Sequence, residues 1–304
     1  MRRAPLTFSI VARDEKTGEM GVAVQSHYFS VGSAVTWARA GVGAVATQAM
    51  VDVRYGPLGL RLMEAGMSAP AALASLLRGD QKPESRQVAM VDSKGRVAAH
   101  TGKLCIPSAG HAVGKGFSCQ GNIMANARVW GAMKGAFEAG KALPLPERLM
   151  GALDAAQGAG GDLRGKQSAA MLVVGPDLKP NYWEGKVIEL RVEDHPEPLE
   201  ELRRLIRFQR GYRWSDAGDD FLSSGRVDKA LGAYAKAMEL VPEMVELKFW
   251  VAISLVSTGK DKPRGLKMLR EVCAKEPRWI QVTRGMVKTG SPPLDASVLR
   301  NIIG

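Results

Sequence analysis

The chain has 304 residues, of which 45% are hydrophobic and 24% are charged, and this balance excludes a disordered chain while allowing one large hydrophobic core or two smaller ones. Its formal net charge of +11 is spread over both halves, without a basic run or a basic strand interleaved with aromatic residues, so we expect no nucleic acid partner. No stretch is long and apolar enough to cross a membrane, so we also expect no membrane association.

The first part of the chain is dominated by predicted strands. Residues 7–13 and 19–26 alternate apolar and polar side chains about a turn at 16–18, and residues 33–48 are rich in β-branched residues and broken by glycines. Two stretches at helical spacing follow, at residues 56–66 and 68–80. Ser68 is expected to cap the second helix, which has an early proline at Pro70.

The pattern then repeats. Residues 86–102 predict a hairpin about 93–95, and a glycine-rich stretch runs to residue 122. Helical spacing returns at 127–140 and 145–161, and strands are predicted at 167–175 and 185–194. This order predicts an α+β fold in which antiparallel sheets pack as a sandwich, with helices on both outer faces.

A domain boundary is expected at His195-Pro-Glu-Pro, because everything beyond it is charged and helical. We therefore predict domains at residues 1–194 and 195–304. The second contains side chains at the spacings of the tetratricopeptide repeat, whose period is about 34 residues, with a degenerate second copy over 245–277. The matching positions are Trp214, Gly218, Phe221, Gly225, Ala230, Tyr234, Ala237 and Pro242. A helical lid without a ligand and a peptide-binding groove are both compatible with this pattern.

Several motifs of known chemistry fail on inspection. The G-x-G-x-x-A match at Gly41 runs into a strand instead of a helix, and the glycines from Gly110 are one residue short of a phosphate loop. His100, Cys105, His111 and Cys119 lack the tight pairs of a zinc site. We therefore expect neither a metal nor a cofactor. The three cysteines, Cys105, Cys119 and Cys273, are odd in number without C-x-x-C spacing, which favours a reducing compartment, the cytoplasm.

Thr7 begins the first strand, and most threonines in such positions are inert. However, residues 7–48, together with "AAHTG", "SAGH", "SCQGN" and "GGDLRGKQSAA", resemble the family of domains of unknown function numbered 1028 over about residues 7–194. That family resembles the N-terminal-nucleophile (Ntn) hydrolases, so the resemblance implies a four-layer αββα sandwich. Relatives also carry a C-terminal extension described as peptidoglycan-binding, which residues from Asp194 onward resemble.

The resemblance implies that Thr7 is the catalytic nucleophile once a leader, residues 1–6, has been cleaved or if the true start lies at Leu6. The freed α-amine, with an ordinary pKa near 8, would act as general base. Gln48, Gln120 and Asn122 are candidate hydrogen-bond donors to the oxyanion, although capping of strand ends explains them equally well.

Other polar residues could line a substrate site. Arg164 could pair with a substrate carboxylate, or bridge to Asp162 within their own turn. The remaining candidates are Ser168, His27 and His100, and for the two histidines a place in the core is the favoured interpretation over a place in the cleft.

Two hypotheses follow from the sequence. The first is a cofactor-free hydrolase that cleaves an amide or related C–N bond of a small molecule through an acyl-Thr7 intermediate. The second is an inert Ntn-like scaffold that binds a protein, a peptide or cell-wall material through residues 195–304. Either is compatible with a homo-oligomer.

Overall fold

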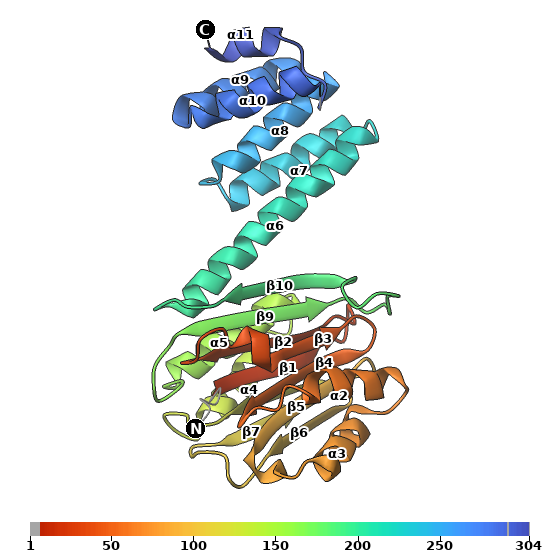
Figure 1. The fold of residues 1–304 in the computed structure, drawn as a ribbon, viewed down its shortest axis with the longest axis vertical. Coiled ribbons are helices and arrows are strands. Elements are labelled where there is room, and N and C mark those ends of the chain that lie inside the picture. The colour runs from red at the N-terminus through yellow and green to blue at the C-terminus, as the bar shows by residue number, and fades with distance from the viewer. Residues whose placement is uncertain (1–6, 291, 304) are drawn as a thin grey trace. The chain divides into compact units, whose positions relative to one another are not determined.

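A computed structural model describes residues 7–290 and 292–303 of the protein, so the expected leader, residues 1–6, lies outside the described residues. The chain forms two compact units, with the division after Arg204 inside a long helix. The first unit contains two antiparallel sheets with helices, and the second is entirely helical (Figure 1).

The larger sheet has six strands in the order β10-β9-β2-β1-β8-β7. The bounds are β1 Thr7–Arg13, β2 Met20–Ser26, β7 Gly110–Gly114, β8 Phe117–Gly121, β9 Ser168–Val174 and β10 Lys186–Val192. β1 and β2 form the predicted hairpin, with Thr7 opposite Ser26. On its other side β1 pairs with β8, which follows it by more than a hundred residues, with Phe8 opposite Gly121.

The smaller sheet has four strands in the order β3-β4-β5-β6, with bounds β3 Thr36–Arg39, β4 Gly43–Ala49, β5 Arg86–Asp92 and β6 Val97–Thr101. A four-residue helix, α1 Gly32–Val35, precedes β3 and occupies positions where the sequence predicted strand. β5 and β6 form the predicted hairpin, in which Gly95 adopts a φ of +77° that glycine tolerates without strain.

Helices cover the outer face of each sheet. Against the smaller sheet lie α2 Tyr55–Glu64 and α3 Ala69–Gly79, and the short 3-10 turn η1 Pro83–Ser85 leads into β5. Ser68 caps α3 as predicted, because its hydroxyl accepts the Ala71 N–H at 3.2 Å. Against the larger sheet lie α4 Val129–Ala139 and α5 Leu145–Gly158.

The two sheets face each other across a layer whose composition changes along the strands. One end is apolar and contains Val11, Val22, Ala46, Ala89 and Leu172 among its buried members. Towards the start of β1 the inward positions become polar. Buried polar groups require hydrogen-bond partners, so this end is held by a network of specific contacts instead of apolar packing alone.

The helical unit begins within α6 Pro198–Ser223 and continues through α7 Val227–Leu240, α8 Val245–Thr258, α9 Lys262–Lys275, α10 Arg278–Thr289 and α11 Ser297–Ile303. Gly218 on α6 approaches Tyr234 on α7 so closely that a Cβ at residue 218 would lie 2.3 Å from the aromatic ring. Gly225 and Gly259 both adopt positive φ, of 76° and 69°, where α6 and α8 end. Gly225 and Gly259, which are 34 positions apart, therefore adopt the same left-handed conformation in the turns that follow α6 and α8.

Within the described part of the chain, no helix is long and apolar enough to cross a membrane.

Candidate functional site

Polar side chains from both sheets meet between them at the end where β1 begins. Alternation in the strands directs residues 7 and 9 of β1, 48 of β4, 87 of β5 and 118 and 120 of β8 into this layer. We name it the polar layer; its members are Thr7, Ser9, Gln48, Gln87, Thr101, Ser118, Gln120 and Asn122. Thr7, Gln48, Gln87, Gln120 and Asn122 have no exposed surface.

Thr7 is held at three points. Its hydroxyl donates to Ser26 Oγ at 3.0 Å. Its carbonyl oxygen accepts two hydrogen bonds at 3.1 Å, one from Gln48 Nε2 and one from the main-chain N–H of Asn122. The sequence prediction named Thr7, Gln48 and Asn122 from three separate segments, and the fold brings them together.

Gln87 links the two sheets at the centre of the polar layer. Its Oε1 accepts from Gln48 Nε2 and from Asn122 Nδ2, both at 2.7 Å. Its Nε2 lies within hydrogen-bond distance of the carbonyl oxygens of Gly121, at 2.9 Å, and Gly110, at 3.1 Å. It also lies 3.0 Å from Thr101 Oγ1, which contacts Nδ1 of the exposed His111 at 2.8 Å.

Gln120 belongs to a second branch of the network. It donates through Nε2 to Ser9 Oγ at 2.7 Å and accepts from Ser118 Oγ at 2.9 Å. Ser9 in turn donates to Gln48 Oε1 at 2.6 Å. Gln120 therefore contacts β1 two residues beyond Thr7.

The hydrogen-bonding capacity of the three predicted amides differs. Both N–H groups of Gln48 are occupied, by Thr7 and Gln87. Asn122 uses one side-chain N–H, on Gln87, and its buried Oδ1 has no hydrogen-bond partner among the described residues. Asn122 is thus the amide beside Thr7 that can still bind another group.

The residues that directly follow Gln48 and Asn122 have strained backbones. Ala49, directly after Gln48, has a φ of +67°, and Ile123, directly after Asn122, has a φ of +55°. A β-branched residue rarely adopts this left-handed conformation, and such strain costs of order 1–3 kcal/mol. Strained residues cluster at functional sites, so their position here favours a functional role for this end of the sandwich.

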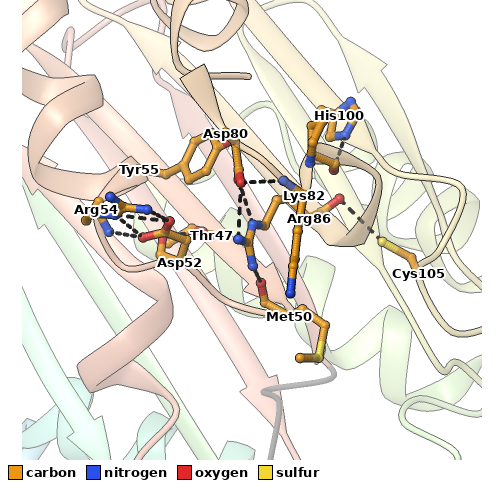
Figure 2. A network of polar contacts seen from close by, with 11 residues as sticks. Thr47, Met50, Asp52, Arg54, Tyr55, Asp80, Lys82, Arg86, His100 and Cys105 are labelled. Atoms are coloured by element: carbon orange, nitrogen blue, oxygen red, sulfur yellow. Dashed lines mark hydrogen bonds and ion pairs between the residues drawn. The ribbon is translucent and has the colours of Figure 1, made fainter. Parts of the chain in front are cut away.

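A network on the outer side of the smaller sheet holds the segment after Gln48 (Figure 2). The guanidinium of Arg86 binds the Asp80 carboxylate at 2.7 Å and also donates to the carbonyl of Met50, and the Tyr55 hydroxyl donates to Asp80 at 3.0 Å. Hydrogen bonds from Arg86 lower the pKa of Asp80 to about 2, against the opposing effect of burial. Burial and then the Asp80 carboxylate raise the pKa of Tyr55, so the phenol stays neutral.

Asp162, Arg164, His27 and Ser168 form a frame at the neighbouring end of β2. The buried Asp162 carboxylate accepts the His27 N–H at 3.1 Å and pairs with the Arg164 guanidinium at 2.8 Å, so the turn bridge considered from the sequence is present. Ser168 accepts the Val31 N–H at 3.1 Å and donates to the Tyr28 carbonyl. The His27 ring is exposed beside the Lys166 carbonyl, with its Nδ1 3.4 Å from that oxygen.

His100 is not brought to the polar layer. It lies opposite Val88 on β5, and Val88 belongs to the cluster packed against α2 and α3, so the imidazole faces the outer side of the sheet. There its Nε2 lies 2.9 Å from the Pro83 carbonyl oxygen (Figure 2). The strand register therefore places His100 on the outer side of the smaller sheet, away from Thr7.

Sequence reasoning missed Ser9, Ser26, Gln87 and Ser118. The available signal was a polar residue at an inward-facing position of an otherwise apolar strand, as in "RQVAMVD", where Gln87 shares the inward parity of Ala89 and Val91. Within residues 7–290 and 292–303, no group of three or more His, Cys, Asp or Glu side chains is arranged to hold a metal.

Exposed apolar side chains surround this end of the sandwich. Ile123 donates its N–H to Ile106 and accepts from Leu163, at 3.0 and 3.1 Å, which joins the loops that carry the exposed Ile106 and Leu163. Met50 and Leu104 are also exposed, and their N–H groups donate to the main chain of residues 84–85. These loops form a rim next to the polar layer.

Comparison with known proteins identifies the family. Residues 7–202 match the family of unknown function DUF1028. The chain belongs to this family. A crystal structure of a Silicibacter pomeroyi protein of DUF1028 is 33% identical, with a TM-score of 0.60 over 66% of this chain and 88% of the other. Anbu (ancestral beta-subunit) from Yersinia bercovieri is 11% identical over 65% of this chain and 91% of its own, with a TM-score of 0.32. No curated protein matches the chain.

Proposed function

We propose that this DUF1028 protein is a hydrolase of an amide or related C–N bond, with Thr7 as its nucleophile after residues 1–6 are removed. The observation that carries the proposal is the placement of Thr7 at the start of β1, bound through its hydroxyl to Ser26 and through its carbonyl to Gln48 and Asn122. Side-chain amides and a fixed hydroxyl are the groups that acyl transfer requires.

The proposed reaction has two steps. Thr7 Oγ1 attacks the substrate carbonyl carbon while its proton passes to the freed α-amine, and that amine then protonates the leaving nitrogen as the C–N bond breaks. Water hydrolyses the resulting ester and restores the hydroxyl. In the chain that begins at residue 1 the Thr7 nitrogen is an amide, which cannot serve as a base, so removal of residues 1–6 is a requirement of this mechanism.

The unequal capacity of the amides assigns them different roles. Asn122 has a side-chain N–H to offer to the developing oxyanion, whereas Gln48 has both committed and positions Thr7. Gln120 fixes Ser9 instead of contacting the substrate. Asp162, with Arg164 and Ser168, holds the loops that frame the site, and His27 lies at its edge.

The same proposal extends to fold and location. We infer that the two sheets with their outer helices form the four-layer αββα sandwich of Ntn hydrolases, and that the helical region forms tetratricopeptide-like hairpins, which the close contact of Gly218 with Tyr234 supports. A cytoplasmic location, a small-molecule amide substrate and the absence of a cofactor belong to this proposal too.

The test combines the mass of the mature protein with three changes at Thr7. Intact mass of the protein purified from its own cells should begin at Thr7. On a panel of small amides that includes N-acyl compounds of increasing chain length, Thr7→Ser should retain activity. Thr7→Ala and a variant with one residue retained before Thr7 should lose roughly a thousandfold or more.

Thr17→Ala is the matched control, because its hydroxyl is exposed in the β1–β2 turn and binds Asp14, and it should retain full turnover. Turnover by Thr7→Ala at the wild-type rate would refute the assignment of the nucleophile. So would a native product that keeps residues 1–6 and is active.

A second candidate is an inert scaffold that binds a protein, a peptide or cell-wall material through residues 195–304. The observation that favours it is that Thr7 has no exposed surface, so its hydroxyl is not open to a substrate. A mature protein that retains those residues and lacks activity on the whole panel would support this candidate.

A further inference from the structure

His111 is an exposed titratable side chain that reaches the polar layer. It lies on β7 opposite Gln120 of β8, and residues opposite each other in antiparallel strands share one face of the sheet, so the imidazole is on the inward side. Its Nδ1 lies 2.8 Å from Oγ1 of Thr101 on β6. His111 therefore connects the larger sheet to an edge strand of the smaller one.

From Thr101 the hydrogen bonds continue inward. Thr101 Oγ1 lies 3.0 Å from Gln87 Nε2. Gln87 Oε1 accepts from the side chains of Gln48 and Asn122. Those two residues also donate to the Thr7 carbonyl oxygen, through a side-chain N–H and a main-chain N–H respectively. Contacts of 3.1 Å or less therefore join the exposed imidazole to the proposed nucleophile.

The partners of Gln87 fix the direction of the hydrogen bonds in this series. Its Nε2 faces the carbonyl oxygens of Gly110 and Gly121, which can only accept, so this atom is the amide nitrogen and it presents an N–H group to Thr101. Thr101 Oγ1 has a single proton, and the acceptor that the described chain offers it is Nδ1 of His111. The arrangement therefore requires the neutral imidazole that carries its proton on Nε2.

A protonated imidazole reverses one of these bonds. Nδ1 of His111 then becomes a donor, so Thr101 Oγ1 faces an N–H group from each side and its own proton loses its acceptor. Gln87 Nε2 has three acceptors for two N–H groups, so it can leave Thr101 for the carbonyls of Gly110 and Gly121 in the larger sheet. The amide that links the two sheets then shifts towards one of them.

Two effects bear on the protonation of His111. Burial of part of the ring and then the like charge of His100 on β6 lower the pKa of His111 below its ordinary 6.5. Beyond the end of β6, the Lys103 N–H binds the Glu84 carboxylate at 2.9 Å. The His111 imidazole is therefore neutral at pH 7 and acquires its charge as the pH falls into the acidic range.

The other two elements packed against β7 are β8 and α4. β8 consists of uncharged residues. The charged side chains of α4 are Lys134 and Glu138, and both act on Cys119, whose side chain faces outward from the sheet. The acidic titration of His111 therefore proceeds without a charged partner on these two elements.

We propose that His111 is a positioning residue for Thr7, which keeps the polar layer ordered while its imidazole is neutral and loosens the layer when the imidazole is protonated. It acts through Thr101 and Gln87. The change in the polar layer stands without any hydrolase activity, whereas its effect on turnover rests on the proposed function. Because the unfolded chain binds this proton more readily than the folded chain, the stabilisation is present above about pH 6.5 and is lost as the pH falls below that value.

The experiment is a titration of the full-length protein by NMR from about pH 8 to about pH 5, the range in which histidine changes its charge. The chain has four histidines, so the imidazole resonances of His111 are assigned by comparison with His111→Gln. The side-chain amide resonances of Gln48, Gln87 and Asn122 should move with the midpoint of the His111 titration. These shifts should be absent in His111→Gln.

Thr101 offers a matched pair of variants. Thr101→Ser keeps the hydroxyl and should retain the coupling between the imidazole and the amides. Thr101→Val keeps the shape and removes the hydroxyl, so most of the amide shifts should disappear while His111 still titrates. Equal amide shifts in the wild type and Thr101→Val would show a through-space effect of the charge and overturn the proposal, as would amide resonances that do not follow the His111 titration.

His195→Gln is the control, because it removes a histidine that lies beyond β10, where its Nδ1 accepts the Glu197 N–H. Its amide shifts should equal those of the wild type, and their loss would also contradict the proposal.

Turnover supplies a second measurement. If Thr7 is the nucleophile, kcat/KM on the amide panel should fall severalfold in step with the protonation of His111, and His111→Gln should lose this inflection while keeping the one from the α-amine. The same pH dependence in both proteins would refute the effect on Thr7. Amide shifts in a protein without turnover would support the role of His111 in the polar layer and count against the hydrolase alone, so the two proposals fail separately.

Discussion

Replacing Gln87 by leucine should destabilise the first unit strongly, because Gln87 is the acceptor that two buried amides share. Leucine is of similar size but offers no Oε1, so Gln48 Nε2 and Asn122 Nδ2 each lose an acceptor at 2.7 Å in a region without solvent. Each unsatisfied buried group costs about 1–3 kcal/mol, so we expect a loss of about 2–6 kcal/mol in the free energy of unfolding. That is a large fraction of the roughly 5–15 kcal/mol that stabilises a typical domain.

The assay is urea unfolding combined with hydrogen exchange of peptides from residues 7–174, which separates this unit from the helical one. The urea midpoint should fall with little change in slope. Gln81→Leu is the control, since Gln81 is exposed, and it should change the free energy of unfolding by less than about 0.5 kcal/mol. If Gln87→Leu costs less than about 1 kcal/mol, the polar layer does not hold the two sheets as described.

Two further predictions concern acid sensitivity and the unit boundary. The pKa of Asp80 in the folded protein is about 2, below its ordinary 3.8, so its ion pair with Arg86 stabilises the fold above about pH 4, and this stabilisation is lost as the pH falls towards 2. Asp80→Asn should therefore lower the Tm at neutral pH and flatten the decline of the Tm between about pH 4 and pH 2. An unchanged dependence of the Tm on acid pH would contradict the assignment. A chain ending at Arg204 should keep the Tm of the first unit. A chain ending at Asp194 loses the buried Leu199 and Leu202, whose burial contributes about 1.5–3 kcal/mol each, so it should unfold several degrees lower. Equal Tm values for the two truncated chains would show that these leucines contribute nothing to the stability of this unit.

Local elements could be predicted from the sequence because their signals are local. The hairpin of β1 and β2 follows from alternation about a turn, and α3 follows from its spacing together with the Ser68 cap. The pairing of β1 with β8 has no such signal, since it joins segments more than a hundred residues apart. The convergence of Thr7 with Asn122 depends on that pairing, so the residues alone could not establish it.

Parity explains why one of the candidate residues, His100, lies away from the polar layer. His100 and Thr101 are neighbours on β6, and a strand turns successive side chains to opposite faces. The register with β5 puts Thr101 opposite Gln87, inside, and His100 opposite Val88, outside. A shift of one residue would exchange them, and the sequence of β6 alone contains too little contrast between its two faces to decide.

The polar layer joins the two sheets through buried amides, and burying polar groups costs free energy unless each one finds a hydrogen-bond partner. Apolar side chains at the positions of Gln48, Gln87 and Gln120 would pack without needing hydrogen-bond partners, as Ala46 and Ala89 do at the next inward positions of β4 and β5. Gln48 instead fixes the Thr7 carbonyl by a direct side-chain hydrogen bond, as the main-chain N–H of Asn122 also does, and the strained Ala49 and Ile123 directly follow these two residues. Stability alone gives no reason for buried amides and strain to coincide around one threonine, whereas the reaction that we propose at Thr7 requires its hydroxyl to be held within a fraction of an ångström.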